Sequence, residues 1–530
     1  MWRCTLVGGY KLTIIGNTLR LARVLGTFRR NGALEPVLDA LAPPARVRRA
    51  AEIFSWLLSP LGVVGDLKLP PISRAIHALG PSYVKFGQVL STRPDVVGEV
   101  LAEDLKELQD NLPPFSNDEA RAMIADQLGA PIDRLFKSLD PPIAAASIAQ
   151  VHPAVMNAGE RVAVKVLRPG VENAFARDIA VFFFVARTIE ALDSRSRRLK
   201  PTMVVRHFEG VVRREMDLRM EAAAGSEYGD LIRDETGVAT PEIIWERTAK
   251  RVLTTSWVDG TRMRDRNELI AQGHDLPIIA KRLVRLFLRT ALGGGYFHAD
   301  MHQGNLKVTK DGVVYAFDFG IMGRIDTDTR RAYAEILYGF LNRDYDRGAR
   351  AHFERGYVKP DQDRAAFAQA LRSIGEPIVG KSAASIAMPQ VLQQLFEVTE
   401  QFGMETREEL ILLQRTMVSV EGVARSLDPN FDMWAAARPE VEKWIAENLG
   451  PAAALRDVGA ALTTLSRIGP KLPILAERAA MWIESDEEGV QAPTEVRSKN
   501  LFWRGVAAGA IGAMLAVFVA SLFFVIGFSP

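Results

Sequence analysis

The sequence has little cysteine and little net charge. Its 530 residues include a single cysteine, Cys4, so no disulfide can form within the chain. The 66 Lys and Arg nearly balance the 64 Asp and Glu, which leaves a formal net charge of +2. With 48% hydrophobic residues, this composition excludes a disordered chain and a protein that coats nucleic acid, so no nucleic-acid partner is expected. No internal repeat is visible, and we expect several packed domains, mainly in a reducing cytoplasm.

The first fifty residues are basic. They contain nine Lys or Arg against Glu35 and Asp39, a local charge of +7, together with apolar runs such as 12–15. Lys11 interrupts the first apolar stretch, so a secretory signal is not expected. A basic segment of this kind suits either an anionic membrane surface or an ordinary solvated helical face, and the sequence leaves both open.

The other end carries a long charge-free stretch. Residues 506–528 hold no charge over 23 residues, which as a helix is about 34 Å, enough for the ~30 Å hydrocarbon layer of a membrane. Gly505 and Gly509 form a GxxxG pair that would allow two such helices to associate in a homodimer. The positive-inside rule places the large N-terminal part on the cytoplasmic face, because basic residues precede the stretch at Arg497, Lys499 and Arg504.

Between these ends, short strand patterns interrupt a mainly helical chain. Apolar runs at 145–156 and 161–167 flank Asn157-Ala158-Gly159-Glu160, which predicts a β-hairpin. Residues 203–232 have helical periodicity. Two further short runs, 305–309 and 313–317, flank a Lys-Asp-Gly turn and predict a second hairpin.

The most specific motif is a spaced set of polar residues around this second hairpin. Asp300 follows His298-Ala299, Asn305 lies five residues later, and Asp318 opens an Asp-Phe-Gly thirteen residues after the Asn. Phosphoryl transfer from a nucleotide needs an Asp that orients the nucleophile, and an Asn and a second Asp whose oxygens hold Mg²⁺ on the phosphates. The set supplies all three, so we predict Asp300 as the catalytic residue and Asn305 and Asp318 as Mg²⁺ ligands.

Upstream, the second strand of the first hairpin resembles the lysine strand of kinases. In Val162-Ala163-Val164-Lys165, the valines share one face, and Lys165 lies on the other beside the small Ala163. A kinase also needs a helix carboxylate to pair with this lysine, and the helical segment 203–232 offers three candidates. If that segment is one helix, Asp217 and Glu221 share a face, and Glu215 points elsewhere.

Two absences argue against ordinary protein phosphorylation. No Ala-Pro-Glu follows Gly320, and the next helix is expected to begin near 326–329, so no long segment exists to seat a polypeptide. Ala299 stands where the usual His-Arg-Asp has its arginine. A second phosphate-binding pattern, GxxxxGKS at 375–382, follows a helical rather than a strand-like segment, so we do not expect a functional P-loop there.

The chain resembles the UbiB family of atypical kinase-like proteins, which is associated with ubiquinone biosynthesis. Beyond the kinase elements, the resemblance is carried by Lys85-Phe86-Gly87-Gln88, by the alanine-rich AAASIAQVH at 144–152, by Glu215-Met216-Asp217 and by the stretch 420–429. These matches run from about residue 70 to 430, most of the chain that precedes the apolar stretch.

The resemblance implies roles for several residues. Lys165 and Glu221 would form the usual kinase ion pair, and Lys85 would reach into the active site and meet Glu215 and Asp217. The alanine-rich stretch would replace the glycine-rich phosphate loop, and because alanine restricts φ the loop would be stiffer. The expected nucleotide-binding residues of this loop are Ala144, Ala145, Ala146 and Ser147.

The resemblance also implies a fold and a function. We expect an α+β, bilobal protein-kinase-like fold with a helical N-terminal extension (1–140), an N-lobe (141–260), a C-lobe (261–450), a helical segment and polar tether (451–505) and a C-terminal transmembrane helix (506–528). The expected activity is ATP- and Mg²⁺-dependent handling of prenylated phenol or quinone precursors at the bacterial inner membrane, together with ubiquinone-biosynthesis enzymes. A phosphotransferase for a small molecule or lipid, and a nucleotide-regulated lipid-binding scaffold, remain open.

Overall fold

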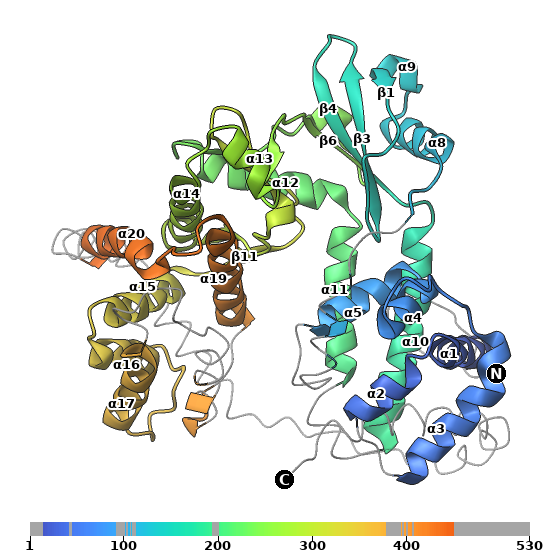
Figure 1. The fold of residues 1–530 in the computed structure, drawn as a ribbon, viewed down its shortest axis with the longest axis horizontal. Coiled ribbons are helices and arrows are strands. Elements are labelled where there is room, and N and C mark those ends of the chain that lie inside the picture. Colours follow the sequence, from blue (N-terminus) through green and yellow to red (C-terminus); the bar gives the residue numbers. More distant parts are fainter. Residues whose placement is uncertain are drawn as a thin grey trace, which may run out of the picture. The chain divides into compact units, whose positions relative to one another are not determined.

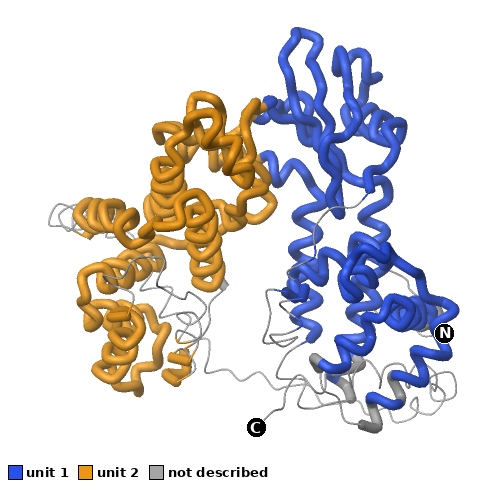
Figure 2. Tube along the Cα trace, in the orientation of Figure 1, with its two compact units in different colours: residues 1–222, 243–257, 497–530 blue, residues 223–242, 258–496 orange. Residues whose placement is uncertain are grey.

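A computed structural model describes residues 14–41, 45–91, 113–192, 201–377 and 408–449, with a few positions between 101 and 108 and between 394 and 404 (Figure 1). The described residues form two compact units. Unit 1 comprises those of 1–222 and 243–257, and unit 2 those of 223–242 and 258–496 (Figure 2). Among these residues no helix has the length and apolar character needed to cross a membrane. The predicted tether and span at 451–528, and most of the GxxxxGKS pattern, lie outside the described residues.

Unit 1 begins with helices. Most of its helices precede the sheet in sequence, two follow the first hairpin, and the unit also holds two short 3₁₀ elements. Their bounds are α1 Ile14–Arg30, α2 Leu34–Leu41, α3 Ala45–Leu58, η1 Ser59–Leu61, α4 Pro71–Leu79, α5 Pro81–Ser91, α8 Asn117–Leu128, α9 Ile132–Leu135, α10 Val171–Leu192, α11 Pro201–Glu215 and η3 Trp245–Arg247. The helix after α11, α12 Leu218–Leu231, contains the boundary between the units.

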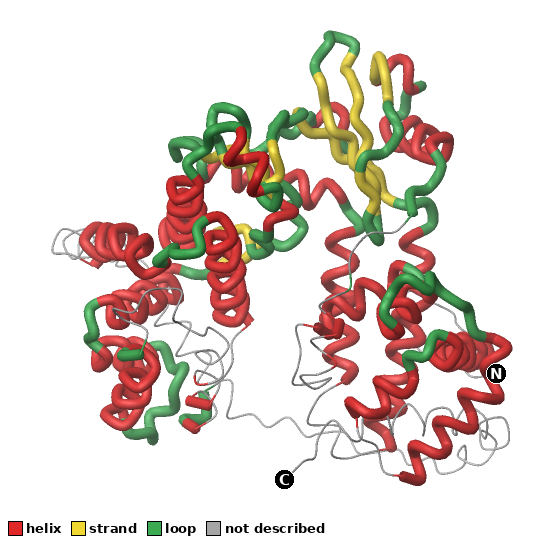
Figure 3. The backbone as a smooth tube through the Cα atoms, viewed as in Figure 1, coloured by secondary structure: helices red, strands yellow, loops and turns green. Residues whose placement is uncertain are grey.

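The sheet of unit 1 has five strands, drawn in yellow in Figure 3. The strand order is β1-β3-β4-β6, with β2 paired to β3, and every pairing is antiparallel. One face of β4 buries Val162, Val164 and Val166 against α8 and α9, while the face that carries Lys165 looks toward the cluster formed by α5, α10 and α11. The strands are β1 Phe136–Leu139, β2 Ala144–Ala145, β3 Ala149–Met156, β4 Arg161–Leu167 and β6 Val252–Ser256.

Unit 2 is mainly helical and holds two small sheets. One has the order β5-β10-β9-β7, in which only β5 and β10 are parallel, and the other pairs β11 with β8 antiparallel. Its strands are β5 Val238–Ala239, β7 Thr261–Arg262, β8 Tyr296–His298, β9 Leu306–Val308, β10 Val314–Ala316 and β11 Met322–Arg324. Its helices are α13 Arg266–Ala271, α14 Leu276–Leu288, η4 Arg289–Gly294, η5 Gln303–Asn305, α15 Thr327–Leu341, α16 Tyr345–Glu354, α17 Arg364–Gly375, α19 Glu408–Leu427 and α20 Met433–Leu449.

Both predicted hairpins are present, as β3–β4 and β9–β10, and α15 begins at Thr327 as expected. Two local predictions were wrong. The N-terminal region is not helical throughout 1–140, because Phe136–Leu139 pairs with β3, a contact distant in sequence. The segment 203–232 is not one helix. It breaks after Glu215, because the Leu218 N–H donates to the Lys250 carbonyl at 2.9 Å rather than to the preceding turn.

Candidate functional site

The strand lysine and a helix carboxylate form an ion pair in unit 1. Lys165 Nζ lies 2.7 Å from Glu221 Oε1 and 2.8 Å from Oε2, and both side chains are mostly buried. Lys165 occupies the half-buried face of β4 because its neighbours Val164 and Val166 fill the opposite face. Glu221 lies in the first turn of α12, where the helix dipole favours a negative charge. The arrangement is the Lys–Glu pair that a kinase-type site requires.

The helix that carries Lys85 contributes a further mostly buried ion pair to unit 1. Lys85 Nζ lies 2.8 Å from Glu215 Oε1, and the two side chains are only 16% and 7% exposed. Helix α5 is fixed to α10 by Ser82, whose hydroxyl donates to Asp178 Oδ2 at 2.7 Å. Phe86 stacks on Phe182 at the same interface. The expected contact between Lys85 and Glu215 is therefore present on a well-anchored helix.

Asp217 has a different partner from the expected one. Its carboxylate accepts hydrogen bonds from the Arg219 guanidinium at 2.7 and 2.9 Å and from the Arg219 N–H at 3.2 Å. These bonds lower the pKa of the Asp217 carboxyl. Asp217 lies in the break between α11 and α12, so the i,i+4 relation to Glu221 that a continuous helix would give does not exist. We therefore assign Asp217 to capping α12 in this structure.

The alanine-rich loop is tightly held. Ala144 and Ala145 form β2 on the edge of β3, and the Ala146 N–H donates to the Ala149 carbonyl at 2.7 Å. Arg168 Nε donates to the Ala146 carbonyl at 2.8 Å, and Ser147 is buried. No residue from 141 to 148, all of which the structure describes, has a positive φ. The backbone thus adopts conformations that alanine tolerates, as a stiffer substitute for a glycine-rich loop would.

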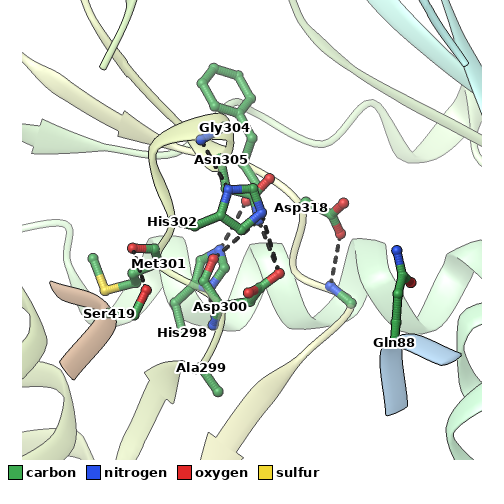
Figure 4. Close-up of polar contacts among 12 residues, drawn as sticks. Gln88, His298, Ala299, Asp300, Met301, His302, Gly304, Asn305, Asp318 and Ser419 are labelled. Atoms are coloured by element: carbon green, nitrogen blue, oxygen red, sulfur yellow. Dashed lines mark hydrogen bonds and ion pairs between the residues drawn. The ribbon is translucent and has the colours of Figure 1, made fainter. Parts of the chain in front are cut away.

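The Asp300 loop of unit 2 joins β8 to β9 and is drawn in Figure 4. Asn305 Nδ2 donates to the Asp300 carbonyl at 3.1 Å and to Asp300 Oδ2 at 3.3 Å. His302 Nε2 lies 3.6 Å from the same carboxylate oxygen. Helix α19 supports the loop from behind, because Thr416 and Ser419 donate to loop carbonyls at 3.3 Å. Asp300 and Asn305 are therefore close together, as their spacing predicted.

Asp318 follows β10 in a conformation that few side chains adopt. Its φ is +60°, and it accepts the Gly320 N–H at 3.3 Å, which turns the exposed carboxylate away from the core. Phe319 points the opposite way and is buried against Tyr228 and His298. Strand β9 pairs with β10, so Asn305 and Asp318 emerge from neighbouring strands of one hairpin.

His298 is a buried structural group of this hairpin. Burial lowers the pKa of His298, which favours the neutral ring. Its Nε2 lies 2.9 Å from the Phe317 carbonyl and its Nδ1 accepts the Asp300 N–H at 3.1 Å. These partners require the proton on Nε2. The neutral ring thus ties the Asp300 loop to the residue that precedes Asp318.

The oxygen donors of this hairpin fit a Mg²⁺–nucleotide complex. Mg²⁺ is usually held by one or two protein oxygens together with phosphates and water, and Asp318 and Asn305 supply such oxygens. No group of three or more His, Cys, Asp or Glu side chains in the described part of the chain could hold a metal alone. A Mg²⁺ ion bound here would complete its coordination with nucleotide phosphates and water.

Two contacts that sequence reasoning missed position these groups. Ser82–Asp178 anchors the Lys85 helix, and Gly225 of α12 approaches Phe319 so closely that a Cβ there would lie 2.7 Å from the ring. Both join residues that are far apart in sequence. The sequence signal for the second contact is Gly225 itself, because a glycine inside a helical pattern often marks the close approach of another group.

Comparison with known proteins identifies the chain's relatives. Residues 107–352 match the ABC1 atypical kinase-like domain and residues 371–432 the UbiB helical domain. A "Probable protein kinase UbiB" of Marinobacter nauticus is 35% identical and covers 91% of this chain and 87% of its own. One of Pseudomonas fluorescens is 34% identical, covering 96% and 95%. A solved structure of a Mycobacterium tuberculosis protein in complex with erythromycin is 23% identical, covers 66% of this chain and 90% of its own, and superposes with a TM-score of 0.45.

These matches agree with the motifs on which the resemblance was recognised. The kinase-like match includes β3, β4, α12 and the β8–β11 region, and therefore Lys165, Glu221, Asp300 and Asp318. The fold is a kinase-like one of mixed helix and sheet. The chain belongs to the UbiB family of atypical kinase-like proteins.

Proposed function

We propose that the chain is a Mg²⁺-dependent enzyme that consumes ATP at the bacterial inner membrane, with its bulk on the cytoplasmic face, in support of ubiquinone biosynthesis. The observation that carries the nucleotide part is the Lys165–Glu221 ion pair at 2.7 Å. An ammonium held by a mostly buried carboxylate is positioned to meet phosphate oxygens, which is the role of the Lys–Glu pair in kinases. The Asp300–Asn305 pair and Asp318 supply the other groups that such chemistry uses.

Each group has a distinct role in this proposal. Lys165 would bind phosphate oxygens, and the stiff loop from Ala144 to Ser147 would lie over the phosphates. Asn305 and Asp318 would hold Mg²⁺, which when bound neutralises charge on the transferred phosphoryl group. Asp300 would orient the attacking oxygen and accept its proton.

The acceptor is proposed to be water or a small hydroxyl rather than a protein. Only Ile321 to Asp326 separate Gly320 from α15, and Met322–Arg324 within this link is already paired to β8. Such a short, structured link leaves no free segment against which a polypeptide could align. Hydrolysis coupled to handling of prenylated phenol or quinone precursors is the favoured activity, and phosphoryl transfer to a small-molecule or lipid hydroxyl is the second.

The remaining parts of the proposal come from family membership and sequence. The UbiB relatives motivate the link to ubiquinone-biosynthesis enzymes as partners, and a nucleotide-regulated lipid-binding scaffold is the non-catalytic alternative. Residues 506–528 would anchor the chain, anionic lipid would attract its basic N-terminal segment, and the GxxxG pair would allow a homodimer.

Product analysis tests this function. Full-length protein in vesicles would be given γ-labelled ATP and Mg²⁺, with and without a prenylated phenol. Label in inorganic phosphate, at a rate that rises with the phenol, is the expected result. Label in a lipid or small molecule would establish transfer instead, and the absence of any Mg²⁺-dependent product would favour the scaffold.

A further inference from the structure

Helix α3 of unit 1 carries an apolar ridge that no described side chain covers. Ile53, Trp56 and Leu57 are 65%, 69% and 62% exposed, and their i, i+3, i+4 spacing places them on one side of the helix. We call these three residues the α3 ridge. Arg49, also exposed, precedes Ile53 by four residues and so lies at the N-terminal end of the same face. Leu61, the last residue of η1, is 50% exposed.

The ridge is presented by a firmly held element. Ser55 is fully buried on the opposite side of α3, and Leu58 packs against the buried cluster that includes Leu21 and Leu25 of α1. The chain after α3 is pinned to Asn31, whose Nδ2 donates to the Val63 carbonyl at 2.7 Å and whose Oδ1 accepts the Gly65 N–H at 2.8 Å. Because the inner face of α3 is packed and the chain that follows α3 is hydrogen-bonded to Asn31, the helix is held with the ridge facing outward.

The chemistry of the ridge and its surroundings fits a lipid surface. Tryptophan beside aliphatic residues, with arginine at the edge, is the composition of helices that lie in the headgroup region of a membrane. Residues 45–68 carry four basic and two acidic side chains. Arg48 is paired with Glu52 at 3.2 Å and with Glu35 and Asp39 of α2 at 3.0 and 2.8 Å, so the cation that borders the ridge is the exposed Arg49. With 14 residues, α3 is about 21 Å long, too short to span a bilayer but long enough to lie in its plane.

We propose that the α3 ridge inserts at the boundary between headgroups and acyl chains of an anionic bilayer, with Arg49 at the phosphate level. This inference rests on the proposed membrane function, and it adds the surface by which the folded part of the chain meets the lipid. The occupant is lipid rather than protein because an exposed cation, Arg49, borders the apolar residues and because residues 45–68 carry more basic than acidic side chains.

A fluorescent label tests this assignment in the full-length chain. Because Cys4 is the only cysteine, Cys4→Ser allows one position to be labelled with an NBD maleimide. Leu57→Cys reports on the ridge, and Trp245→Cys, at a tryptophan that is 51% exposed in η3, is the matched control. Each protein is compared in vesicles of phosphatidylcholine with and without phosphatidylglycerol. MgATP binding by the same samples reports separately on the nucleotide site.

The expected result is a blue shift and a rise in NBD emission at position 57 in anionic vesicles. The change should be smaller in neutral vesicles, should decrease as salt rises, and should be absent at position 245. Ile53→Gln with Trp56→Gln should reduce it, since glutamine keeps the helix propensity. An emission at position 57 that phosphatidylglycerol does not change overturns the proposal. So does a high emission that is independent of salt and of lipid composition. A rise of that emission with the protein-to-lipid ratio would indicate a second copy, and no such rise would indicate coverage by the chain's own residues. Intact MgATP binding in those cases would leave the proposed function standing.

Discussion

Two mostly buried ion pairs contribute to the stability of unit 1. Lys165 and Glu221 are 20% and 10% exposed, and Lys85 and Glu215 are 16% and 7% exposed. Removing either partner of such a pair leaves a poorly hydrated charge, which costs more than the loss of a surface ion pair. The four residues therefore link stability to the geometry of the candidate site.

Glu221→Gln should test the kinase-type pair. Because Lys165 loses its charged partner, we expect the free energy of unfolding to fall by about 1–3 kcal/mol and ATP turnover by about a hundredfold. Denaturant unfolding and phosphate release measure the two effects. Glu227→Gln is the matched control, because Glu227 pairs with Arg324 on the surface, at 49% exposure. Equal turnover in both variants would remove Lys165–Glu221 from the site.

Lys85→Ala should unbalance the carboxylate of Glu215. The substitution removes the ammonium 2.8 Å from Glu215, so we expect lower stability together with a changed preference among nucleotides, or self-phosphorylation. Competition between ATP and ADP, and incorporation of label into the protein, are the measurements. Lys68→Ala, at an exposed position, serves as the control. A Lys85→Ala protein that behaves like Lys68→Ala would contradict this placement.

At the scale of elements, α12 positions the Asp-Phe-Gly turn through one small residue. Gly225→Ala would place a Cβ 2.7 Å from the Phe319 ring, so Phe319 must move and Asp318 with it. We expect weaker Mg²⁺-dependent nucleotide binding, measured by titration calorimetry. Gly210→Ala in α11 is the control, since its nearest neighbour is 3.9 Å away and the change should stabilise the helix by about 0.5–1 kcal/mol. Unchanged binding by Gly225→Ala would show that Phe319 does not hold Asp318 in place.

Helix α16 should make unit 2 sensitive to acid. Burial lowers the pKa of His352 to about 4, because its ring packs near Phe367 and Tyr357. In the unfolded chain a histidine pKa is about 6.5, so the unfolded chain binds the proton more readily than the folded one. The free energy of unfolding therefore falls as the pH drops from about 6.5 toward about 4. His352 alone should cost about 2 kcal/mol between pH 7 and pH 5. His352→Gln should reduce the shift in melting temperature over this range, and an unchanged shift would contradict the assignment.

Local chemistry explains which elements could be predicted. The Asn157-Ala158-Gly159-Glu160 turn and the alternating valines specified β3–β4, because both signals lie within one short segment. The break after Glu215 could not be predicted, because its cause is a hydrogen bond from Leu218 to Lys250, thirty-two residues away. Strand β1 was missed for the same reason, since its partner β3 lies beyond the alanine-rich loop.

At the scale of the whole molecule, the predicted site divides between two compact units. Lys85, Lys165 and Glu221 belong to unit 1, and Asp300, Asn305 and Asp318 to unit 2. The spacing of the second set predicted its closeness, because a hairpin brings its two ends together. Residue spacing could not tell which of three carboxylates pairs with Lys165. The family resemblance predicted Glu221 as its partner, and also predicted the contact between Lys85 and Glu215. Of the two contacts predicted for Lys85, the one with Glu215 is present, whereas the Asp217 carboxylate is bound by Arg219.

The central claim, a Mg²⁺-dependent nucleotide site, is tested most directly by MgATP binding to full-length Asp318→Asn. The change is isosteric and Asp318 is exposed, so the fold should persist, with a melting temperature close to that of the parent. Titration calorimetry with ATP, with and without Mg²⁺, should show tight binding only for the parent protein with Mg²⁺, because the variant loses a charged metal ligand. Equal Mg²⁺-dependent affinity in both proteins would contradict the account.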